Sequence, residues 1–394
     1  MSDSRCIGII GAGIGGISAA IALRLAGYDP IVFEQAPAIT EIGAGISLSP
    51  NAVKGLHWLG VSKSLGAIAD EPTQQSTCHY QTGKTLVRFD RTSTTEQYGA
   101  PYWQMHRADL QTALLARLYE LSPKALRLNH VFQSFKKKDC ELELLFANNK
   151  NCRVAALIGA DGLKSNVRAQ YFDKNEANFS GFVAWRGLVP AALLRERNFC
   201  AGSAVFAGPG RIFVRYPIRQ GALMNYIAFT KASRWEAESW SQTGSTTDIQ
   251  AALADFHPEV QAILTANLHG QCHKWGLFAR EPLSQWCKGA LALLGDAAHP
   301  MMPWFGQGAA CAIEDAVVLG RCVSECTHSK DLPHAFLRYQ NTRLNRVTMI
   351  HREALAGGER LAGMQPELLS NESVRNEDSL GIFNYDPRYV VLPT

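Results

Sequence analysis

Near the N-terminus, apolar residues first form a short continuous run and then recur at helical spacing. The run Cys6–Ile10 predicts a buried strand of a parallel sheet, and the glycine-rich stretch GAGIGG follows it at once. The next stretch, ISAAIALRLAGY, is rich in small residues and predicts a helix that ends at Gly27. A second apolar stretch, PIVFEQ, predicts a strand that ends at Glu34. The order strand, glycine turn, helix, strand is that of a βαβ unit in a doubly wound sheet.

Farther along the chain, β-type patterns alternate with helical ones. Residues 78–101 are polar and strand-like around a Gly-Lys turn, and apolar residues at helical spacing predict a helix over 107–120. Three β-type stretches, FVAWRGLVP, RIFVRYPI and LMNYIAFT, lie between 176 and 275, where a helix opened by Asp248 follows them. From residue 305 onward the pattern is mainly helical. The dinucleotide-type signals are therefore separated by inserted β-rich material.

Composition and charge exclude several classes of protein. A chain of 394 residues suggests two or three domains, and a net charge of +4, scattered along it, is too small for a nucleic-acid-binding surface. The 10 cysteines are irregularly spaced and are typical of reduced thiols in a cytoplasmic protein. Cys322, Cys326 and His328 have no fourth ligand nearby, so we expect no metal site. The uncharged stretch 6–23 changes from a strand pattern to a helical one, so we expect neither a membrane segment nor a signal peptide.

The glycine motif predicts a dinucleotide site. Gly11 permits a tight turn, Gly13 lets the backbone approach a pyrophosphate, and Gly16 lets the helix pack closely on the sheet. The pyrophosphate would lie at a helix N-terminus, where free N–H groups and the helix dipole favour anions. Glu34 is placed to accept hydrogen bonds from a ribose. The alternative is a tight turn without a ligand, and the motif does not say which dinucleotide is bound.

Two further segments resemble motifs of flavin-dependent aromatic hydroxylases. Residues 157–168, LIGADGLKSNVR, resemble the DG motif, and residues 293–300, LLGDAAHP, continued by GQGAACAIEDA, resemble the GD motif. Residues 43–51 and 106–110 are also similar to this family. The motifs occur in the family's order and spacing, and the resemblance covers nearly the whole chain. The chain thus resembles the single-component (group A) flavoprotein monooxygenases, and within them salicylate hydroxylase and 3-hydroxybenzoate 6-hydroxylase.

The resemblance implies the α/β fold of p-hydroxybenzoate hydroxylase. This fold has a Rossmann-like FAD-binding domain, an inserted β-sheet substrate domain and C-terminal helices. The expected boundaries are 1–77, 102–175 and 276–325 for a discontinuous FAD-binding domain, 78–101 and 176–275 for the substrate-binding sheet, and 326–394 for a C-terminal helical segment.

The resemblance also implies the chemistry. NAD(P)H, a transient co-substrate without a second glycine fingerprint, would reduce FAD, and O2 would then form a flavin C4a-hydroperoxide that hydroxylates a small aromatic or heteroaromatic substrate. The alternatives are an FAD-dependent reductase, dehydrogenase or oxidase without oxygen insertion, and a flavin-binding protein without turnover. We expect a monomer or a homodimer.

The predicted cofactor site combines residues from the whole chain. Asp296 ends a buried apolar run, so its carboxylate can meet the ribityl chain of FAD, and the stretch 306–309 opens a helix whose N–H groups can face the isoalloxazine. By resemblance, Arg107 contacts the flavin or its phosphates, unless it is an ordinary surface residue, and Asp161 serves both FAD and NAD(P)H. The predicted set is Gly11, Ala12, Gly13, Gly15, Gly16, Glu34, Gln35, Gly45, Arg107, Asp161, Asp296, Pro303, Gly306, Gln307, Gly308 and Ala309.

The predicted substrate pocket is apolar and aromatic. Its residues are Trp185, Ile212, Tyr216, Pro303 and Trp304. Relatives that hydroxylate phenolic acids commonly carry a His four residues before the position of Tyr216, as a candidate general base. This chain has Ile212 there, which cannot take a proton. Tyr216 then takes that role, or Arg215 stabilises the phenolate, or an amino group activates the substrate instead.

Overall fold

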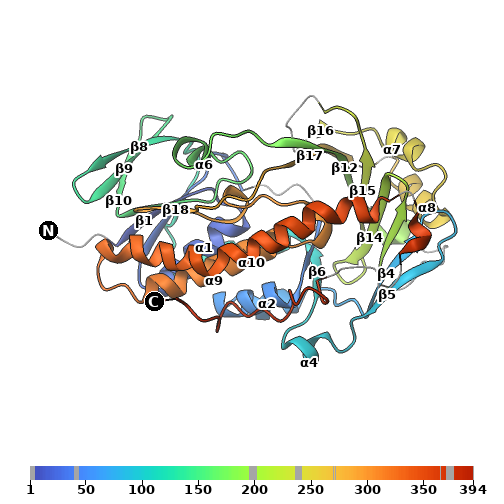
Figure 1. The fold of residues 1–394 in the computed structure, drawn as a ribbon, viewed down its shortest axis with the longest axis horizontal. Helices are drawn as coiled ribbons and strands as arrows, with labels where there is room; N and C mark the ends of the chain where they lie inside the picture. The colour runs from blue at the N-terminus through green and yellow to red at the C-terminus, as the bar shows by residue number, and fades with distance from the viewer. Residues whose placement is uncertain are drawn as a thin grey trace.

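The computed structural model describes residues 5–39, 44–194, 202–235, 242–268, 270, 272–363, 365–369 and 377–393. Figure 1 shows an elongated molecule with a mainly parallel sheet at one end and a larger, mainly antiparallel sheet at the other. The long helix α10 (Leu332–Leu361) runs along the molecule between these two ends. The candidate site lies between the two sheets.

The first sheet has the strand order β18-β19-β11-β1-β2-β7. Its strands are β1 (Cys6–Ile10), β2 (Asp29–Phe33), β7 (Leu126–Arg127), β11 (Ala156–Gly159), β18 (Cys287–Lys288) and β19 (Leu291–Leu293). β1 pairs in parallel with β2 on one side and with β11 on the other, and β11 pairs in parallel with β19. The glycine motif, the DG motif and the GD motif therefore follow three neighbouring parallel strands, and they meet at the same edge of the sheet.

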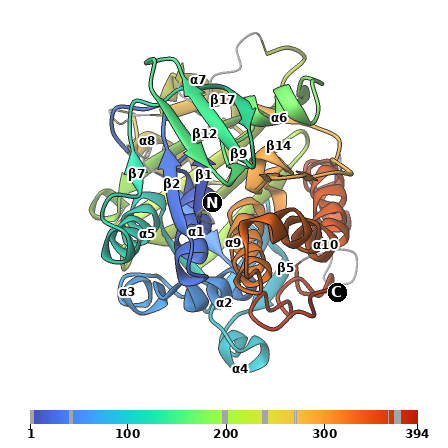
Figure 2. The ribbon, with the colours of Figure 1, turned by 90° about the vertical axis from the view of Figure 1, so that its left-hand side faces the viewer.

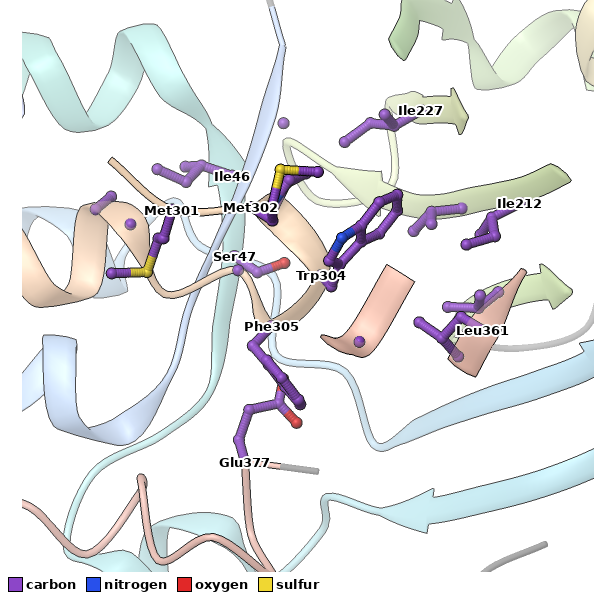
Figure 3. Close-up of a pocket in the computed structure, with 18 of the residues that line it drawn as sticks. Ile46, Ser47, Ile212, Ile227, Met301, Met302, Trp304, Phe305, Leu361 and Glu377 are labelled. Atoms are coloured by element: carbon purple, nitrogen blue, oxygen red, sulfur yellow. The ribbon is translucent and has the colours of Figure 1, made fainter. Parts of the chain in front are cut away.

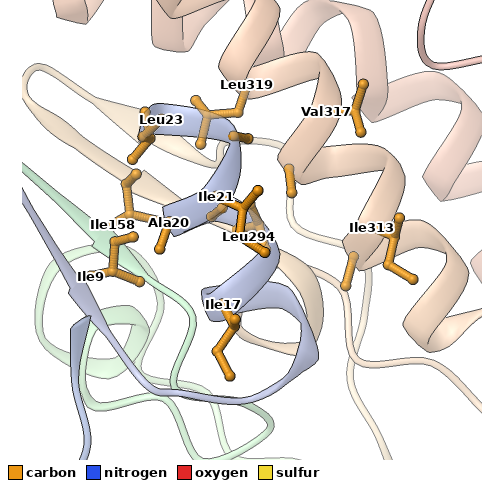
Figure 4. Packing of buried hydrophobic residues seen from close by; sticks show 14 of the residues in the cluster. Ile9, Ile17, Ala20, Ile21, Leu23, Ile158, Leu294, Ile313, Val317 and Leu319 are labelled. Carbon is orange, nitrogen blue, oxygen red and sulfur yellow. The ribbon is translucent and has the colours of Figure 1, made fainter. Parts of the chain in front are cut away.

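Helices cover this sheet and form the main core. Helix α1 (Ile14–Leu25) lies between α5 (Arg107–Leu121) and α9 (Gly308–Ser324), as Figure 2 shows. Figure 4 shows Ile17 and Ile21 of α1 packed among strand residues and the apolar side of α9. Close packing of α1 on α9 needs small residues, since a Cβ on Gly320 would lie 2.8 Å from the Cβ of Ala22.

The second large sheet has the order β16-β17-β12-β15-β14-β13-β4-β5. Its strands are β4 (Gln74–His79), β5 (Thr85–Asp90), β12 (Asn178–Pro190), β13 (Ser203–Gly208), β14 (Arg211–Ile218), β15 (Leu223–Lys231), β16 (Gln242–Thr243) and β17 (Cys272–Ala279). One face packs on α7 (Thr246–Ala252) and α8 (Pro258–Ala266) in a separate apolar cluster. The other face carries Ile212 and Phe229, which pack with the loop before α9 and the end of α10.

Smaller elements connect and flank the two sheets. The pair β3 (Gly45–Leu48) and β6 (Trp103–His106) forms a two-stranded sheet, and β8 (Phe132–Lys138), β9 (Glu141–Phe146) and β10 (Asn151–Val154) form a three-stranded one. The remaining helices are α2 (Pro50–Leu59), α3 (Ser62–Gly66), α4 (Thr94–Tyr98) and α6 (Asn166–Tyr171). In the described part of the chain, no helix has the length and apolar character that crossing a membrane requires.

Some element boundaries differ from the sequence predictions. β4 begins at Gln74, ahead of residue 78, and β17 ends at Ala279, beyond residue 275. Helix α7 begins at Thr246 after Ser245, so Asp248 lies in its first turn and does not open it. The division into domains stays a prediction.

The C-terminal segment is less helical than predicted. After α10 and a short 3-10 turn at Pro366–Leu368, residues 377–393 form turns and irregular backbone, and we call this segment the C-terminal strap. The strap is held by side chains of other elements: Lys54 Nζ donates to the Phe383 carbonyl (2.9 Å) and Arg321 Nη1 to the Pro387 carbonyl (2.9 Å). Its conformation depends on these long-range contacts, which local helix propensity does not report.

Candidate active site

A cavity of about 890 Å³ lies between the glycine-rich edge of the first sheet and the open face of the large sheet. One wall consists of backbone-rich loops that contain Gly13, Gly295 and Gly306. The opposite wall consists of apolar side chains, among them Ile212 and Ile227, with Trp304 and Leu361 beside them (Figure 3). The two walls differ in chemistry, as expected of a site that holds a polar nucleotide next to an apolar ring.

The glycines of the first motif have distinct physical roles. Gly11 has φ +102°, and a Cβ there would lie 2.4 Å from the Ala160 carbonyl oxygen. A Cβ on Gly16 would lie 2.0 Å from the Gly11 carbonyl oxygen, so both positions must be glycine for the protein itself to pack. A Cβ on Gly13 would meet no protein atom within 4 Å. Gly13 borders free space at the N-terminus of α1, which is room for a bound anion.

Glu34 fixes the same turn. Its Oε2 accepts a hydrogen bond from the N–H of Ala12 (2.9 Å), and its Oε1 accepts one from the N–H of Ala36 (2.9 Å). Gln35 is exposed, and neither residue lines the cavity. The contact of Glu34 with a ribose and the part of Gln35 in cofactor binding stay predictions.

Asp296 faces the cavity from the GD loop. It is the exposed residue in the otherwise buried stretch 291–300, and that exposure is toward the cavity. Although the side chain is accessible from the cavity, the surrounding protein atoms desolvate its carboxyl and raise its pKa, and the charges of His299 and Arg107 lower this pKa in part. Arg107 also lines the cavity, and its backbone N–H donates a hydrogen bond to the carbonyl of Ala44 (2.8 Å), the residue before Gly45. The structure thus brings Gly45, Arg107 and Asp296 to one cavity.

The N-terminus of α9 opens onto the same space. Gly306 (φ +62°), Gly308 and Ala309 line the cavity, so the first N–H groups of a 17-residue helix are directed toward it. Gln307 does not line the cavity with its side chain, and a contact of its backbone with the cofactor stays a prediction. The side chain is buried, donates to Ser49 Oγ (3.0 Å) and accepts from Asn51 Nδ2 (3.0 Å).

A buried charge network supports these loops from behind. Asp315 Oδ2 accepts from the Gly295 N–H (3.1 Å), and Arg343 Nε donates to Asp315 Oδ1 (2.8 Å). Arg343 and Arg346 also pair with Glu314, at 2.6 and 2.9 Å. Burial by itself would raise the pKa of Asp315, but His299 and Arg343 outweigh it and hold that pKa below its ordinary value. The two arginines lie on α10, and nothing in the sequence pattern marks them as part of the site.

The carboxylate of Asp161 caps α6. It accepts hydrogen bonds from Ser165 Oγ (2.6 Å), the Asn166 N–H (2.7 Å) and the Val167 N–H (3.2 Å). Its neighbours Ala160 and Gly162 line the cavity, whereas Asp161 does not. Asp161 therefore holds the DG loop in shape, and a direct contact with FAD or NAD(P)H stays a prediction.

Four of the five predicted pocket residues line the cavity: Ile212, Tyr216, Pro303 and Trp304. Trp304 packs against Phe229 (ring centroids 4.6 Å apart) and Phe182 (5.2 Å). Glycine at position 358 is needed for this, since a Cβ there would lie 2.5 Å from the Trp304 indole nitrogen. The loop before α9 thus closes the apolar wall.

Trp185 and Arg215 require correction, because both lie on the opposite face of the large sheet. Trp185 belongs to the apolar cluster beneath α7 and α8, and its Nε1 donates to Thr230 Oγ1 (3.2 Å). Arg215 is buried and pairs with Glu259 of α8 at 2.6 Å. Side chains alternate between the faces of a strand, and here both faces are buried and apolar, so the pattern does not reveal which face meets the cavity.

The cavity also contains polar residues that the sequence analysis missed. Tyr216 hydrogen-bonds to Ser47, which also bonds to Tyr102. Burial raises the pKa of Tyr216, although Arg186 lowers it in part. Arg186 is the cavity-facing neighbour of Trp185. The further polar lining residues that the sequence analysis did not name are Gln75, Ser76, Thr77, Arg91, Gln104, Ser203, Arg360, Gln365 and Glu377.

These observations fit a flavin dinucleotide. The free space at Gly13 and the N-termini of α1 and α9 suit anionic or electron-rich groups, and Asp296 offers an acceptor for hydroxyl groups between them. These features lie together at the edge where the parallel strands of the sheet end. Dinucleotide sites in doubly wound sheets form at this edge.

Known proteins resemble this chain over most of its length. The family model described as "FAD binding domain" matches residues 5–354. A 3-amino-4-hydroxybenzoate 2-monooxygenase of Streptomyces platensis is 34% identical over 353 residues, covering 89% of this chain and 87% of the relative. A 3-hydroxybenzoate 6-hydroxylase of Polaromonas naphthalenivorans is 33% identical over 352 residues, covering 87% and 84%.

Solved structures share the fold. HpxO of Klebsiella pneumoniae, complexed with FAD and uric acid, has a TM-score of 0.83 at 25% identity and covers 97% of this chain and 95% of its own. A salicylate hydroxylase substrate complex has a TM-score of 0.84 at 23% identity, with 100% and 99% of the two chains covered.

Proposed function

Because this chain belongs to the FAD-binding family of flavoprotein aromatic monooxygenases, we propose that it uses NAD(P)H and O2 to hydroxylate a small aromatic ring bearing a hydroxyl group. The family, the fold and the FAD cofactor expected from the motifs are confirmed. Relatives are named for action on 3-amino-4-hydroxybenzoate, 6-hydroxynicotinate and 3-hydroxybenzoate. All three names describe a small ring with an electron-donating substituent.

The observation that carries the proposal is the two-walled cavity. FAD, when bound, supplies the redox chemistry and the activation of oxygen. The chain would hold its pyrophosphate at Gly13 and the α1 N-terminus, and its ribityl hydroxyls at Asp296. The N-terminus of α9 would favour negative charge on the ring system, and Arg107 would add a cation at the same wall.

The opposite wall would position the substrate ring and exclude water. Ile212, Phe229 and Trp304 form an apolar surface that suits a flat ring. Excluding water limits the side reaction in which the activated oxygen is released as hydrogen peroxide instead of being transferred to the ring. Tyr216 keeps its proton at neutral pH because burial raises its pKa, so it would donate a hydrogen bond to an oxygen of the substrate.

The test uses purified protein and a panel of hydroxybenzoates, hydroxypyridines and hydroxyquinolines. NAD(P)H oxidation should accelerate with a suitable ring, and one atom of ¹⁸O from ¹⁸O2 should enter the product for each turnover. Hydrogen peroxide as the sole oxygen product with every compound would instead favour an oxidase or reductase without oxygen insertion. Asp296→Ala should lower FAD retention, measured by flavin absorbance after gel filtration.

A further inference from the structure

With Ile212 in place of a histidine, another group must accept a proton if the substrate ring is activated as a phenolate. Among the described residues that line the cavity, the ionisable side chains are Arg91, Arg107, Arg186, Arg360, Tyr102, Tyr216, Asp296 and Glu377. Arginine stays protonated in proteins. Burial raises the pKa values of Tyr102 and Tyr216, so both keep their protons near neutral pH. The two carboxyl groups are therefore the proton acceptors of this lining.

Asp296 lies on the cofactor wall. A Cβ on Gly308, at the start of α9, would lie 3.8 Å from Asp296 Oδ1, and Arg107 is its nearby cation. Asp296 thus belongs to the loops that cradle the dinucleotide.

Glu377 reaches the cavity from the C-terminal strap. Figure 3 shows its side chain next to Phe305, and both residues line the cavity. The charged and titratable groups that face it are Arg91, which follows β5, and Tyr102, which precedes β6. Arg91 is nearly fully buried and donates through Nε to Gln75 Oε1 (2.8 Å), and its guanidinium stacks over Phe383 at 5.0 Å.

The strap holds Glu377 in place. The Ile382 N–H donates to the Glu377 carbonyl (2.8 Å), and the hydroxyl of Tyr98 donates to the neighbouring Asp378. Buried Lys54 donates to the Phe383 carbonyl (2.9 Å). The side chain is therefore presented by an anchored segment, as a group that takes part in proton transfer requires.

We propose, on the basis of the proposed function, that Glu377 is the general base that replaces the histidine expected at position 212. Its carboxylate takes the proton from a hydroxyl on the substrate ring, and the O–H electron pair stays on oxygen as a phenolate that enriches the ring carbons in electrons. The proton remains on Glu377, beside Arg91, until product release returns it to solvent. The substrate class is therefore a ring with an ionisable hydroxyl group.

The pH dependence follows from the surroundings of Glu377. Burial raises the pKa of this carboxyl above its ordinary value, and Arg91 lowers it in part. The base form is populated only above the raised pKa, so kcat/KM should rise with pH through that value and then level off.

The experiment compares Glu377→Gln, Glu377→Asp and Glu367→Gln as FAD-loaded enzymes. Glu367 is the matched control, because its carboxylate is largely exposed and pairs with His79. With the ring found in the screen, Glu377→Gln should lower kcat by about 100-fold or more and lose the acid limb of the kcat/KM profile. Glu377→Asp should keep that limb, and Glu367→Gln should match the wild type. An unchanged profile in Glu377→Gln overturns the proposal.

A binding readout separates this proposal from the proposed function. The visible absorbance of 4-nitrophenolate reports how far bound 4-nitrophenol is ionised, without turnover. At a fixed pH below the pKa of the free phenol, binding to wild type should raise the ionised fraction, and binding to Glu377→Gln should not. Equal ionised fractions in both proteins would refute the role of Glu377 even if the enzyme hydroxylates. A difference would support it even if no ¹⁸O enters any product.

If Glu377→Gln fails to fold, Glu377→Asp decides the question. This variant retains a carboxylate, so loss of the acid limb of its kcat/KM profile with FAD still bound overturns the proposal.

Discussion

The carboxylate of Asp315 lies 2.5 Å from Nε2 of His299, and both side chains are almost completely buried. The same carboxylate accepts hydrogen bonds from the backbone N–H of Gly295 and from Nε of Arg343. A residue of α9 therefore ties the loop that carries Asp296 to the long helix α10. The cavity wall depends on this buried network as well as on the residues that face the ligand.

Replacing Asp315 by Asn should destabilise the protein strongly. The change leaves Arg343 with one anionic partner fewer in a fully buried site, where breaking an ion pair costs about 3–5 kcal/mol. The free energy of unfolding, measured by urea titration, should fall by that amount. Asp29→Asn serves as the control: its partner Arg24 is half exposed, so the loss should be about 1 kcal/mol or less. Similar losses for both variants would contradict the network.

Two glycine substitutions should separate protein packing from cofactor binding. Gly13 has φ −71° and ψ −179°, which alanine adopts freely, and its Cβ would meet no protein atom. Gly13→Ala should therefore leave the apoprotein as stable as the wild type and weaken FAD binding by about tenfold or more, or ~1.4 kcal/mol. Gly16→Ala should destabilise the apoprotein by about 1–3 kcal/mol, because its Cβ collides with the Gly11 carbonyl. Thermal unfolding of apoprotein and flavin fluorescence titration measure the two effects.

The stability of the protein should fall in acid in a way that depends on Asp315 and Glu314. Burial would raise the pKa of each carboxyl, but the charges of His299, Arg343 and Arg346 hold both below their ordinary values. A carboxyl with a lowered pKa contributes stability above its unfolded pKa of about 4, and this contribution is lost as pH falls through the folded value. Burial raises the pKa of Asp296 and Glu377, so these groups act in the opposite sense.

The comparison of wild type with Asp315→Asn isolates this contribution. Melting temperatures measured from pH 3 to pH 7 should begin to converge as the pH falls below about 4, because Asp315 is then protonated in the unfolded chain while its lowered pKa keeps it ionised in the folded protein. A constant difference over the whole range would mean that Asp315 is not ionised in the folded protein.

Neighbouring residues of β14 should separate stability from catalysis. Arg215→Met breaks a buried pair with Glu259 on the far face of the sheet, so it should lower stability by several kcal/mol and leave the kcat/KM of the folded fraction within about twofold. Tyr216→Phe removes one hydrogen bond to Ser47, so it should cost about 1 kcal/mol of stability and lower kcat/KM by about tenfold. Urea titration and steady-state kinetics on the same preparations test both. A large kinetic defect in the Arg215 variant would restore its predicted catalytic role.

Local patterns predicted the parts of the site that are built from consecutive residues. The strand β1, the turn from Gly11 to Gly16 and helix α1 follow from a buried run, a glycine pattern and helical spacing. The position of Asp296 at a strand end is local in the same way. In each case, neighbours along the chain supply most of the physical constraints, so the sequence contains the needed information.

Local patterns did not predict which face of the large sheet a given side chain occupies. The sequence predicts Trp185 as a pocket residue and Arg215 as a catalytic one, whereas both face α7 and α8. Both faces of these strands are buried, so the alternation of side chains has no polar side to mark the surface.

The sequence alone determined the βαβ unit, the glycine turn and the resemblance to a flavoprotein family, since each rests on motifs whose own residues are consecutive in the chain. The tertiary structure decided which face of the large sheet meets the cavity, which helix supplies Arg343 and Arg346, and that Glu377 from the C-terminal strap lines the site. These relationships join residues far apart in the chain, and they arise only when the sheets, α10 and the strap pack together and bury their charges as pairs.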